Sequence, residues 1–211
     1  MTAVLSSTFF GPVQWYQKLY RYDRVIIEHC DSYQKQTYRN RCLIAATNGV
    51  QALTVPVESP SSPPQSGEAM EKGVRISDHG NWRHQHWQAL TSAYGDSPFF
   101  QYYEDDLKPF FTEKWEFLYD YNETIRQKMC ELLDIQPQVA ITKEFFQDYS
   151  GLSEDLFHDF REAIQPKHPQ PDPDFLPRRY YQVYERKHGF LPNLSILDLL
   201  FNMGPESVFL L

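Results

Sequence analysis

The segment from Tyr33 to Arg41 is the part of the sequence best suited to binding a charged small molecule. It contains three basic residues and no acidic one, in a chain of 20 basic and 28 acidic residues. A guanidinium matches the geometry of phosphate and carboxylate groups, and an ammonium supplies a point charge. Neutral polar side chains in the same segment could orient such a ligand. The candidate binding residues are Gln34, Lys35, Tyr38, Arg39, Asn40 and Arg41.

This anion-site hypothesis assumes that the basic side chains converge. If residues 39–41 begin a strand, Arg39 and Arg41 project to the same face. The alternative is a solvated strand end, whose charges form structural ion pairs with an acidic helix. We favour the anion site because charge, amides and aromatic rings lie together in an acidic chain.

Three histidines between residues 78 and 87 suggest either a metal site or a proton-transfer group. His79, His84 and His86 lack the short H-x-x-x-H spacing of a zinc-binding helix, and no cysteine is nearby. We therefore predict no metal ligand. His86 is a candidate acid or base near neutral pH. The alternative is that it packs against Trp82 in the core.

The segment from 184 to 198 contains a second group of candidate catalytic residues. His188 follows two basic residues and precedes a glycine, a setting that favours an exposed imidazole. Asn193 precedes a predicted helix start, where free N–H groups can bind an anion, and is a candidate for substrate binding. Asp198 is a candidate catalytic carboxyl. However, Ser195-x-x-Asp198 resembles a capping box, and capping is the favoured interpretation.

The Gly11-Pro12 turn after the first predicted strand is a weaker candidate. Ligands of open α/β sheets lie beyond the carboxyl ends of the strands. The chain contains neither a G-x-G-x-x-G nor a Walker sequence. We therefore expect no dinucleotide or ATP, and we predict no cofactor.

Charge and composition restrict the partners. The net charge of −8 argues against nucleic acid as the main partner, because a duplex-binding protein needs a basic face. No apolar run approaches the roughly 20 residues of a spanning helix, so we expect no membrane. The absence of a secretory signal and the three widely spaced cysteines predict a cytoplasmic protein with free thiols. The oligomeric state is left open.

The first third of the chain must provide the elements that position these residues. Residues 3–9 read as a strand, and Gly11-Pro12 precedes a helix with apolar residues at helical spacing, beginning at Trp15. Residues 25–27 are β-branched and read as a buried strand. Strand, helix and strand within thirty residues predict a crossover unit and a partly parallel sheet.

A β-hairpin is expected at about residues 41–57. Two apolar runs flank Asn48-Gly49, the dipeptide preferred in a type I′ turn with positive φ at both central residues. Beyond it we predict a Pro/Ser-rich loop at 59–67, a short strand at 74–76 and helices at 81–94 and 109–133. Later elements are a helix opening at Ser153, an extended Pro-rich segment at 165–177, a strand at 180–184 and a helix after Ser195. The fold class is α/β or α+β, with a single domain over 1–211.

Several stretches resemble the WbqC-like protein family, in the expected order and across almost the whole chain. Those most specific to the family lie at 34–41 and 190–202. The others are Phe10-Gly11-Pro12, 53–56, Asn81-Trp82 with His86-Trp87, 97–100 and Gly204. The resemblance implies a bacterial cytoplasmic protein. The family name comes from a surface-polysaccharide gene cluster, which implies a link to sugar-nucleotide chemistry.

The resulting hypothesis is a protein that binds a small anionic metabolite, such as a sugar nucleotide or an activated acyl or amino donor. Whether it is an enzyme stays open, and the enzyme class suggested is a transferase. Lys35, Arg39 and Arg41 would hold the anion, and His188 or His86 would move a proton. The alternative is a non-catalytic interaction module or subunit of a glycan-assembly system, suggested by the 16% aromatic content.

Overall fold

Four parallel strands form the larger of two sheets. The computed structural model describes residues 1–31, 33–58, 73–142 and 156–211. The strands β1 (Thr2–Ser6), β2 (Arg24–Glu28), β5 (Val139–Ile141) and β6 (Phe157–Asp159) lie in the order β5-β2-β1-β6. The helix α1 (Val13–Arg21) connects β1 to β2, and this confirms the predicted crossover. Residues 3–5 at the centre of β1 are fully buried, as expected for a parallel strand covered on both faces.

The second sheet is the predicted hairpin, formed by β3 (Arg41–Ala46) and β4 (Gly49–Thr54). Its turn differs from the type I′ expectation. Ala46 pairs with Gly49, so the central turn residues are Thr47 and Asn48, and of the Asn48-Gly49 pair only Gly49 has positive φ, at 108°. The register is therefore one residue earlier than the Asn-Gly rule predicts, and within the hairpin Gly49 takes the position with positive φ.

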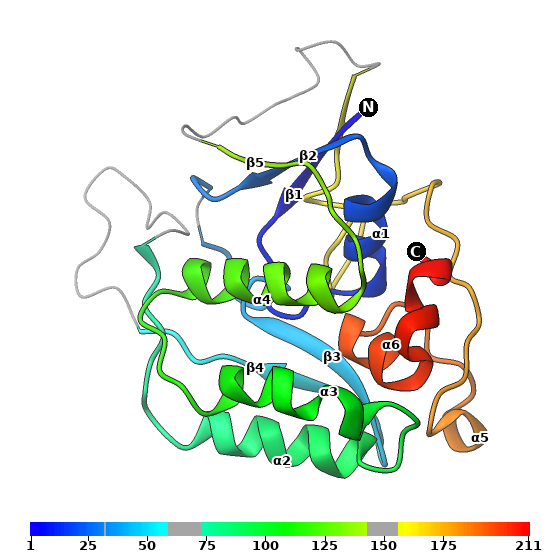
Figure 1. The fold of residues 1–211 in the computed structure, drawn as a ribbon. Helices are drawn as coiled ribbons and strands as arrows, with labels where there is room; N and C mark the ends of the chain where they lie inside the picture. The colour runs from blue at the N-terminus through cyan, green and yellow to red at the C-terminus, as the bar shows by residue number, and fades with distance from the viewer. Residues whose placement is uncertain (32, 59–72, 143–155) are drawn as a thin grey trace.

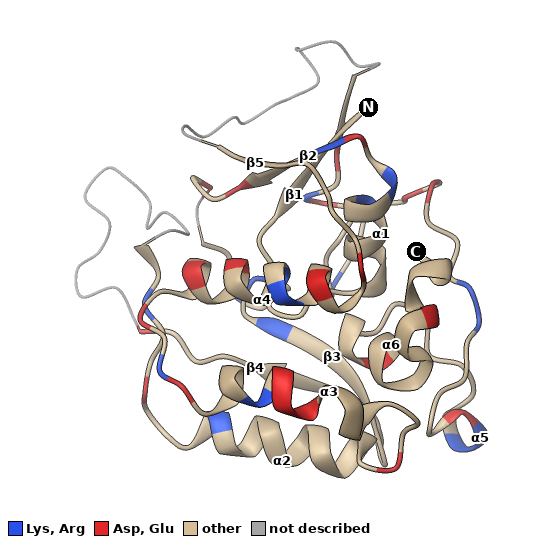
Figure 2. Ribbon diagram, viewed as in Figure 1, with Lys and Arg blue, Asp and Glu red and all other residues tan. Residues whose placement is uncertain are grey.

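Helices lie on both sides of the hairpin in the view of Figure 1. The helices α2 (Trp82–Tyr94) and α3 (Phe100–Leu107) lie at the opposite end from the parallel sheet, and β3 crosses between them and α4 (Leu118–Leu132) in this view (Figure 1). The remaining helices are α5 (Glu185–His188), α6 (Ile196–Met203) and the 3-10 segments η2 (Lys108–Phe111) and η4 (Gly204–Leu210). The helix α4 carries both acidic and basic residues, whereas most of the hairpin is uncharged (Figure 2).

One continuous cluster of buried apolar side chains includes residues of both sheets and of α1, α2, α4 and α6. The combination of a parallel sheet, an antiparallel hairpin and packed helices confirms the α/β or α+β class. The segment 165–177 contains no helix or strand, as its prolines predict. Asp172 anchors it to α1 through a buried ion pair, with 2.8 Å between Oδ2 and Lys18 Nζ.

Two predicted helices were wrong in their extent or type, because a long-range contact overrides the local pattern. The helix expected over 109–133 begins only at Leu118, because Glu116 and Leu118 form backbone hydrogen bonds with Ile76 and Val74. Ser153 and the loop 59–67 lie outside the described residues. Within the described part of the helix predicted from Ser153, residues 157–159 form the strand β6, paired with β1, and residues 160–164 are not helical.

The strand expected at 180–184 is absent from the described structure, although buried and exposed side chains do alternate along residues 180–182. Tyr180 and Gln182 are buried, and Tyr181 is 54% exposed. The side chains of Tyr180 and Gln182 both bind Asp198, and the backbone turns at 183–184 into α5. A period-two pattern without a neighbouring strand gives extended backbone but no sheet.

Candidate functional site at the sheet switch point

The order of the parallel strands creates a switch point between β1 and β6. The chain runs from β1 to β2 and then to β5 on one side, and β6 returns to the other side of β1. Connections leaving the two carboxyl ends therefore diverge, which leaves a crevice between them. Ser6 ends β1 and Asp159 ends β6, so this crevice is the expected ligand position.

A small hollow of about 10 Å³ lies at this position. Its walls come from the residues after β1, the residues after β6 and the segment before β3. They include Ser6, Ser7, Thr8, Thr37, Tyr38, Arg39, Phe160, Arg161 and Gln165. The enclosed space holds one water-sized group. A larger ligand would therefore insert only a terminal atom.

Two arginines bring positive charge to the wall of the hollow. Arg161 binds Asp159 through Nε, at 3.0 Å from Oδ1, and through a terminal nitrogen, at 2.6 Å from Oδ2. Arg39 places a guanidinium nitrogen 2.7 Å from Asp31 Oδ2 and is 3% exposed. Burial alone would lower the pKa of the Arg161 guanidinium, but the hydrogen bonds that Arg161 donates to Asp159 and the charges of Asp159, Asp31 and Glu28 raise that pKa overall.

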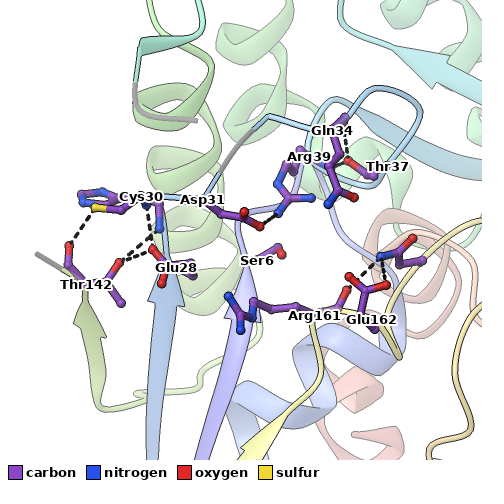
Figure 3. A network of polar contacts seen from close by, with 12 residues as sticks. Ser6, Glu28, Cys30, Asp31, Gln34, Thr37, Arg39, Thr142, Arg161 and Glu162 are labelled. Atoms are coloured by element: carbon purple, nitrogen blue, oxygen red, sulfur yellow. Dashed lines mark hydrogen bonds and ion pairs between the residues drawn. The ribbon is translucent and has the colours of Figure 1, made fainter. Parts of the chain in front are cut away.

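Carboxyl groups at the end of β2 face these arginines (Figure 3). Glu28 is fully buried, and its Oε1 accepts hydrogen bonds from Cys30 N and from Thr142 Oγ1, both at 2.7 Å. Glu28 pairs in register with Ser6 on the neighbouring strand. Registered residues of adjacent parallel strands point to the same face. The Glu28 carboxyl group therefore lies on the Ser6 side of the sheet, where Arg161 also lies.

Two hydroxyl groups at the hollow lack hydrogen-bond partners. Thr8 Oγ1 and Ser6 Oγ are buried atoms without a partner in the structure, and Thr8 as a residue is 4% exposed. Buried polar atoms normally have partners, because leaving one unpaired costs about 1–3 kcal/mol. Glycine at position 11 allows Thr8 to pack against the backbone there, since a Cβ at that position would lie 2.4 Å from Thr8 Oγ1.

The loop 7–12 that carries Thr8 is held by α4 and by the C-terminal part of the chain. Asn122 Nδ2 donates to Ser7 Oγ at 2.9 Å and to the Arg39 carbonyl at 2.8 Å, so one side chain joins two walls of the hollow. Ser195 Oγ donates to the Phe10 carbonyl at 2.8 Å. Phe10 has φ of 41°, a strained value for a phenylalanine that these contacts maintain.

The structure separates the predicted anion-binding residues into three groups. Tyr38 and Arg39 line the hollow. Gln34 and Lys35 are exposed. Arg41 Nε donates to Thr54 Oγ1, and Asn40 Nδ2 donates to the Val55 carbonyl, so both belong to the hairpin. Burial raises the pKa of Tyr38 to about 12, and the Cys42 thiol adds to the shift.

The three basic side chains therefore do not share one face. Strand β3 begins at Arg41, so Arg39 precedes the strand and the alternation rule does not relate the two arginines. Asn193 lies at the start of α1, where its Oδ1 accepts from Gln14 N at 3.0 Å and its Nδ2 donates to Gln14 Oε1. It caps that helix, because Pro12 at the N-cap provides no side-chain acceptor.

The predicted catalytic residues lie away from the lining of the hollow. His188 Nε2 is 3.0 Å from the Thr47 carbonyl at the hairpin turn. His86 is 7% exposed and packs between Phe9 and Trp82, at ring-centroid distances of 6.1 and 5.2 Å. Burial lowers its pKa to about 4, and a hydrogen bond with the Thr54 backbone opposes that shift.

Asp198 is fully buried and accepts three hydrogen bonds, from Tyr94 Oη at 2.8 Å, Tyr180 Oη at 2.6 Å and Gln182 Nε2 at 2.8 Å. Burial raises the pKa of its carboxyl, and the three donors oppose the shift. Ser195 caps α6 as predicted, by accepting from Leu197 N at 3.3 Å. In a capping box, the Asp198 side chain would also accept from Ser195 N. That part of the prediction was wrong, because Ser195 N instead donates to the Leu43 carbonyl.

Sequence reasoning missed most of the residues at the hollow. Ser6, Thr8 and Arg161 end or follow strands, but only the Gly11-Pro12 turn was singled out for that reason. The missing signal was β6, whose three residues do not read as a strand. Without β6 the position of the switch point is undefined.

Other grooves of the described residues are larger, and one of about 270 Å³ is lined by Trp115, whose buried Nε1 also lacks a partner. No three His, Cys, Asp or Glu side chains in the described ranges lie close enough to hold a metal ion. Two open grooves, of about 560 and 620 Å³, are lined by no buried polar atom without a partner among the described residues. Cys30, Cys42 and Cys130 are buried free thiols. No described helix is both long and apolar enough to cross a bilayer.

The fold and this crevice define a protein with a parallel sheet whose carboxyl edge carries a small polar hollow lined by two arginines. The chain belongs to the WbqC-like protein family, whose model matches residues 7–169. It is similar to the uncharacterized protein Rv1507c of Mycobacterium tuberculosis, with 26% identity over 97% of this chain and 94% of the relative. No solved structure shows significant similarity to this chain.

Proposed function

We propose that the protein binds a small anionic metabolite at the switch point, with an anionic oxygen entering the hollow between Arg39 and Arg161. The observation that carries this proposal is the buried Thr8 hydroxyl, which lacks a partner, in a residue that lines the same hollow as Arg39 and Arg161. An anionic oxygen would accept from that hydroxyl and from the arginines. Such a ligand would satisfy a polar atom that the folded chain leaves unpaired.

The rest of the ligand would lie outside the hollow, since the enclosed space admits only a terminal group. We propose a sugar nucleotide or an activated acyl or amino donor as the metabolite, and group transfer in surface-polysaccharide biosynthesis as the reaction. Support for that chemistry comes from the family resemblance. Support for the position comes from the strand order, because ligands of open α/β sheets bind where the connections diverge.

A thermal-shift panel on the full chain tests the binding site. The probes are inorganic phosphate, sugar nucleotides, acyl phosphates, acyl thioesters and dicarboxylates, each on the wild type and on Arg161→Gln. A ligand at 100 times its Kd stabilises the folded state by about 2.7 kcal/mol. For a chain of this length that corresponds to a rise in Tm of roughly 5 to 10 °C.

Arg83→Gln is the matched control, because Arg83 is an ion-paired arginine of α2 with similarly low side-chain exposure, 13% against 10% for Arg161. The expected result is a Tm rise in the wild type and Arg83→Gln that is lost in Arg161→Gln. Thr8→Val provides a second, more conservative test of the same site. The proposal is overturned if no anion raises the wild-type Tm, or if the responding anion still binds both site variants with wild-type affinity.

A further inference from the structure

The second strand of the hairpin, β4, has an edge with which no described strand pairs. Its partner on the other edge is β3, and Val55 N donates to the Asn40 carbonyl at 2.8 Å, which fixes the phase of their ladder. Hydrogen-bonded pairs of an antiparallel ladder recur at every second residue, so the backbone groups of Val50 and Ala52 point away from β3. Neither residue has another hydrogen bond within the described ranges. Their N–H and C=O groups are therefore available to a further strand.

The opposite edge of the hairpin is closed by the protein itself. Ala45 N donates to Tyr94 Oη at 3.0 Å, and the Leu43 carbonyl accepts from Ser195 N at 2.8 Å. Both are backbone groups of β3 that point away from β4. The hairpin sheet can therefore be extended beside β4 but not beside β3.

Nothing in the sequence of β4 protects its edge. Natural proteins shield edge strands with charged side chains, proline, bulges or short length. β4 has six residues in continuous register with β3, and residues 42–57 contain no charged side chain. The edge strands of the other sheet, β5 and β6, have three residues each. A longer edge without charge, proline or bulge is the kind that pairs with another chain.

The surface beside β4 has room for an added strand. Residues 50–52 are exposed, with Val50 at 52%. The open groove of about 620 Å³ lies between these residues and α2, where it is lined by the small side chains of Ala89, Ser92 and Ala93. No charged side chain of the described residues lines this groove. It therefore suits uncharged side chains of a neighbouring strand.

The free part of this edge is symmetric about Gln51. Toward the end of β4, a hydrogen bond with His86 already engages the Thr54 backbone. The unpaired backbone groups therefore belong to Val50 and Ala52, one residue on either side of Gln51. An antiparallel strand of the same sequence, centred on the same residue, would place Val50 of one copy opposite Ala52 of the other. Each such pair would exchange two backbone hydrogen bonds.

We propose that two copies of this chain dimerise by antiparallel pairing of their β4 strands, which gives one continuous sheet across a two-fold axis. A two-fold contact needs a self-complementary surface, and this edge provides one. Two copies with net charges of −8 repel each other, so an uncharged edge lets them approach without opposing like charges. The residues of this edge do not line the hollow, so the dimer is independent of the proposed anion site.

Sedimentation velocity on the full chain measures this dimer over a concentration range of about 1 to 100 μM. We expect the mass to rise with concentration from that of one chain to that of two. Amide hydrogen exchange adds a readout for single residues. The Val50 and Ala52 amides should exchange more slowly at high concentration, whereas the Gln51 amide, which faces β3, should be protected at every concentration.

Ala52→Pro is the sharpest variant, because it removes an N–H that points away from β3 and leaves the hairpin ladder intact. It should raise the dissociation constant of the dimer at least about tenfold, whereas Ala52→Ser, which keeps the N–H, should not. Val50→Lys tests the same edge without changing the backbone and should weaken the dimer to a similar degree. Its matched control is Ile141→Lys, at a β-branched position of the edge strand β5 with 44% exposure, which should dimerise like the wild type.

A chain that stays monomeric up to about 100 μM overturns the proposal. A dimer whose dissociation constant is unchanged in both Ala52→Pro and Val50→Lys also overturns it, because such a dimer forms elsewhere. Thermal unfolding of each variant shows whether a lost dimer reflects a lost fold, and Val50→Lys decides if Ala52→Pro does not fold. A monomeric chain that binds a synthetic peptide of residues 48–55 would assign the edge to an extended segment of another protein instead of a second copy.

Discussion

The Asp198 cluster and the switch-point hollow are two polar regions buried in the same protein, and they differ in how completely they are satisfied. Around Asp198, both carboxylate oxygens have donors, and Tyr94 Oη also accepts from Ala45 N at 3.0 Å. At the hollow, charged groups are paired, but the Ser6 and Thr8 hydroxyls are not. A complete network fixes the fold, whereas an incomplete one beside a cavity is where a ligand adds hydrogen bonds.

The difference also involves charge and connectivity. The three donors to Asp198 are neutral and come from α2 and the segment 180–182, so the cluster joins distant elements. The hollow instead collects ionised side chains from the ends of neighbouring strands. Asp198 was predicted from sequence as a catalytic candidate, and its surroundings fit a structural role instead. Arg161, which was not predicted, lies at the switch point of the sheet, the position that ligands occupy in open α/β folds.

The largest expected effect is the loss of stability on Asp198→Ala. This substitution leaves two tyrosine hydroxyls and the Gln182 amide without their acceptor in the interior. At about 1–3 kcal/mol for each buried unsatisfied group, partly relieved by relaxation, the free energy of unfolding should fall by about 3 to 5 kcal/mol. Urea unfolding measures it. Asp105→Ala on the exposed surface of α3 should change the stability by less than about 0.5 kcal/mol. A loss below 1 kcal/mol for Asp198→Ala would show that the cluster is dispensable.

The next effect is pH-dependent and comes from His86. Its pKa is about 4 in the folded protein and near 6.5 when unfolded, so the unfolded chain takes up the proton first as the pH falls. Stability is unaffected above pH 6.5 and decreases between about 6.5 and 4, by up to about 3 kcal/mol. The measurement is the stability difference between the wild type and His86→Phe across that range. His84→Gln, at an exposed position, should keep the wild-type slope. If the stability of the wild type and of His86→Phe changed with pH in the same way, His86 would not be the source of the pH dependence.

A smaller loss is expected for Gly11→Ala, because the new Cβ would lie 2.4 Å from Thr8 Oγ1 and 3.0 Å from Thr8 Cβ. Overpacking of this kind costs about 1–3 kcal/mol. Part of the loss should be recovered when Thr8→Ala is added, which a double-mutant cycle detects as a coupling energy. Gly73→Ala is the control, since nothing lies within 4 Å of its added Cβ. Strict additivity of the two changes would mean that the loop moves away freely.

The smallest expected effect is that of Thr8→Val, and it separates an unpaired buried hydroxyl from a hydrogen-bonded one. Thr8→Val removes a hydroxyl that forms no hydrogen bond, so the stability should stay within about 0.5 kcal/mol of the wild type or rise slightly. Thr142→Val removes a hydroxyl that donates to Glu28 at 2.7 Å, and it should cost about 1 to 2 kcal/mol. Equal losses for both valines would show that the Thr8 hydroxyl is satisfied in solution.

Local patterns were reliable where the stabilising contacts are close in sequence. The α1 crossover, the hairpin at Asn48-Gly49 and the Ser195 cap were all predicted and found. Predictions from local patterns were wrong or incomplete where pairing with a distant segment sets the backbone conformation. Residues 157–159 carry part of an apolar helical stripe, yet they pair with β1, because that position in the sheet satisfies their backbone groups.

Some residues of the candidate site could likewise be recognised from local sequence, and others could not. Arg39 was recognisable because basic and amide-bearing residues gather in one short segment of an acidic chain. Arg161, Glu28 and Thr8 were not, since none lies in a distinctive local pattern. Arg39 and Arg161 line one hollow although more than a hundred residues separate them in sequence, and no local pattern could have predicted that proximity.

Composition and local spacing by themselves determined an acidic, mixed α/β or α+β chain, with a β1–α1–β2 crossover, a hairpin and residues suited to an anion. Only the tertiary structure decided which polar residues meet. Each side chain carries its own charge and hydrogen-bonding capacity, which can be read from the sequence. Its neighbours depend on strand order, and this order was set here by the pairing of the three-residue strand β6 with β1.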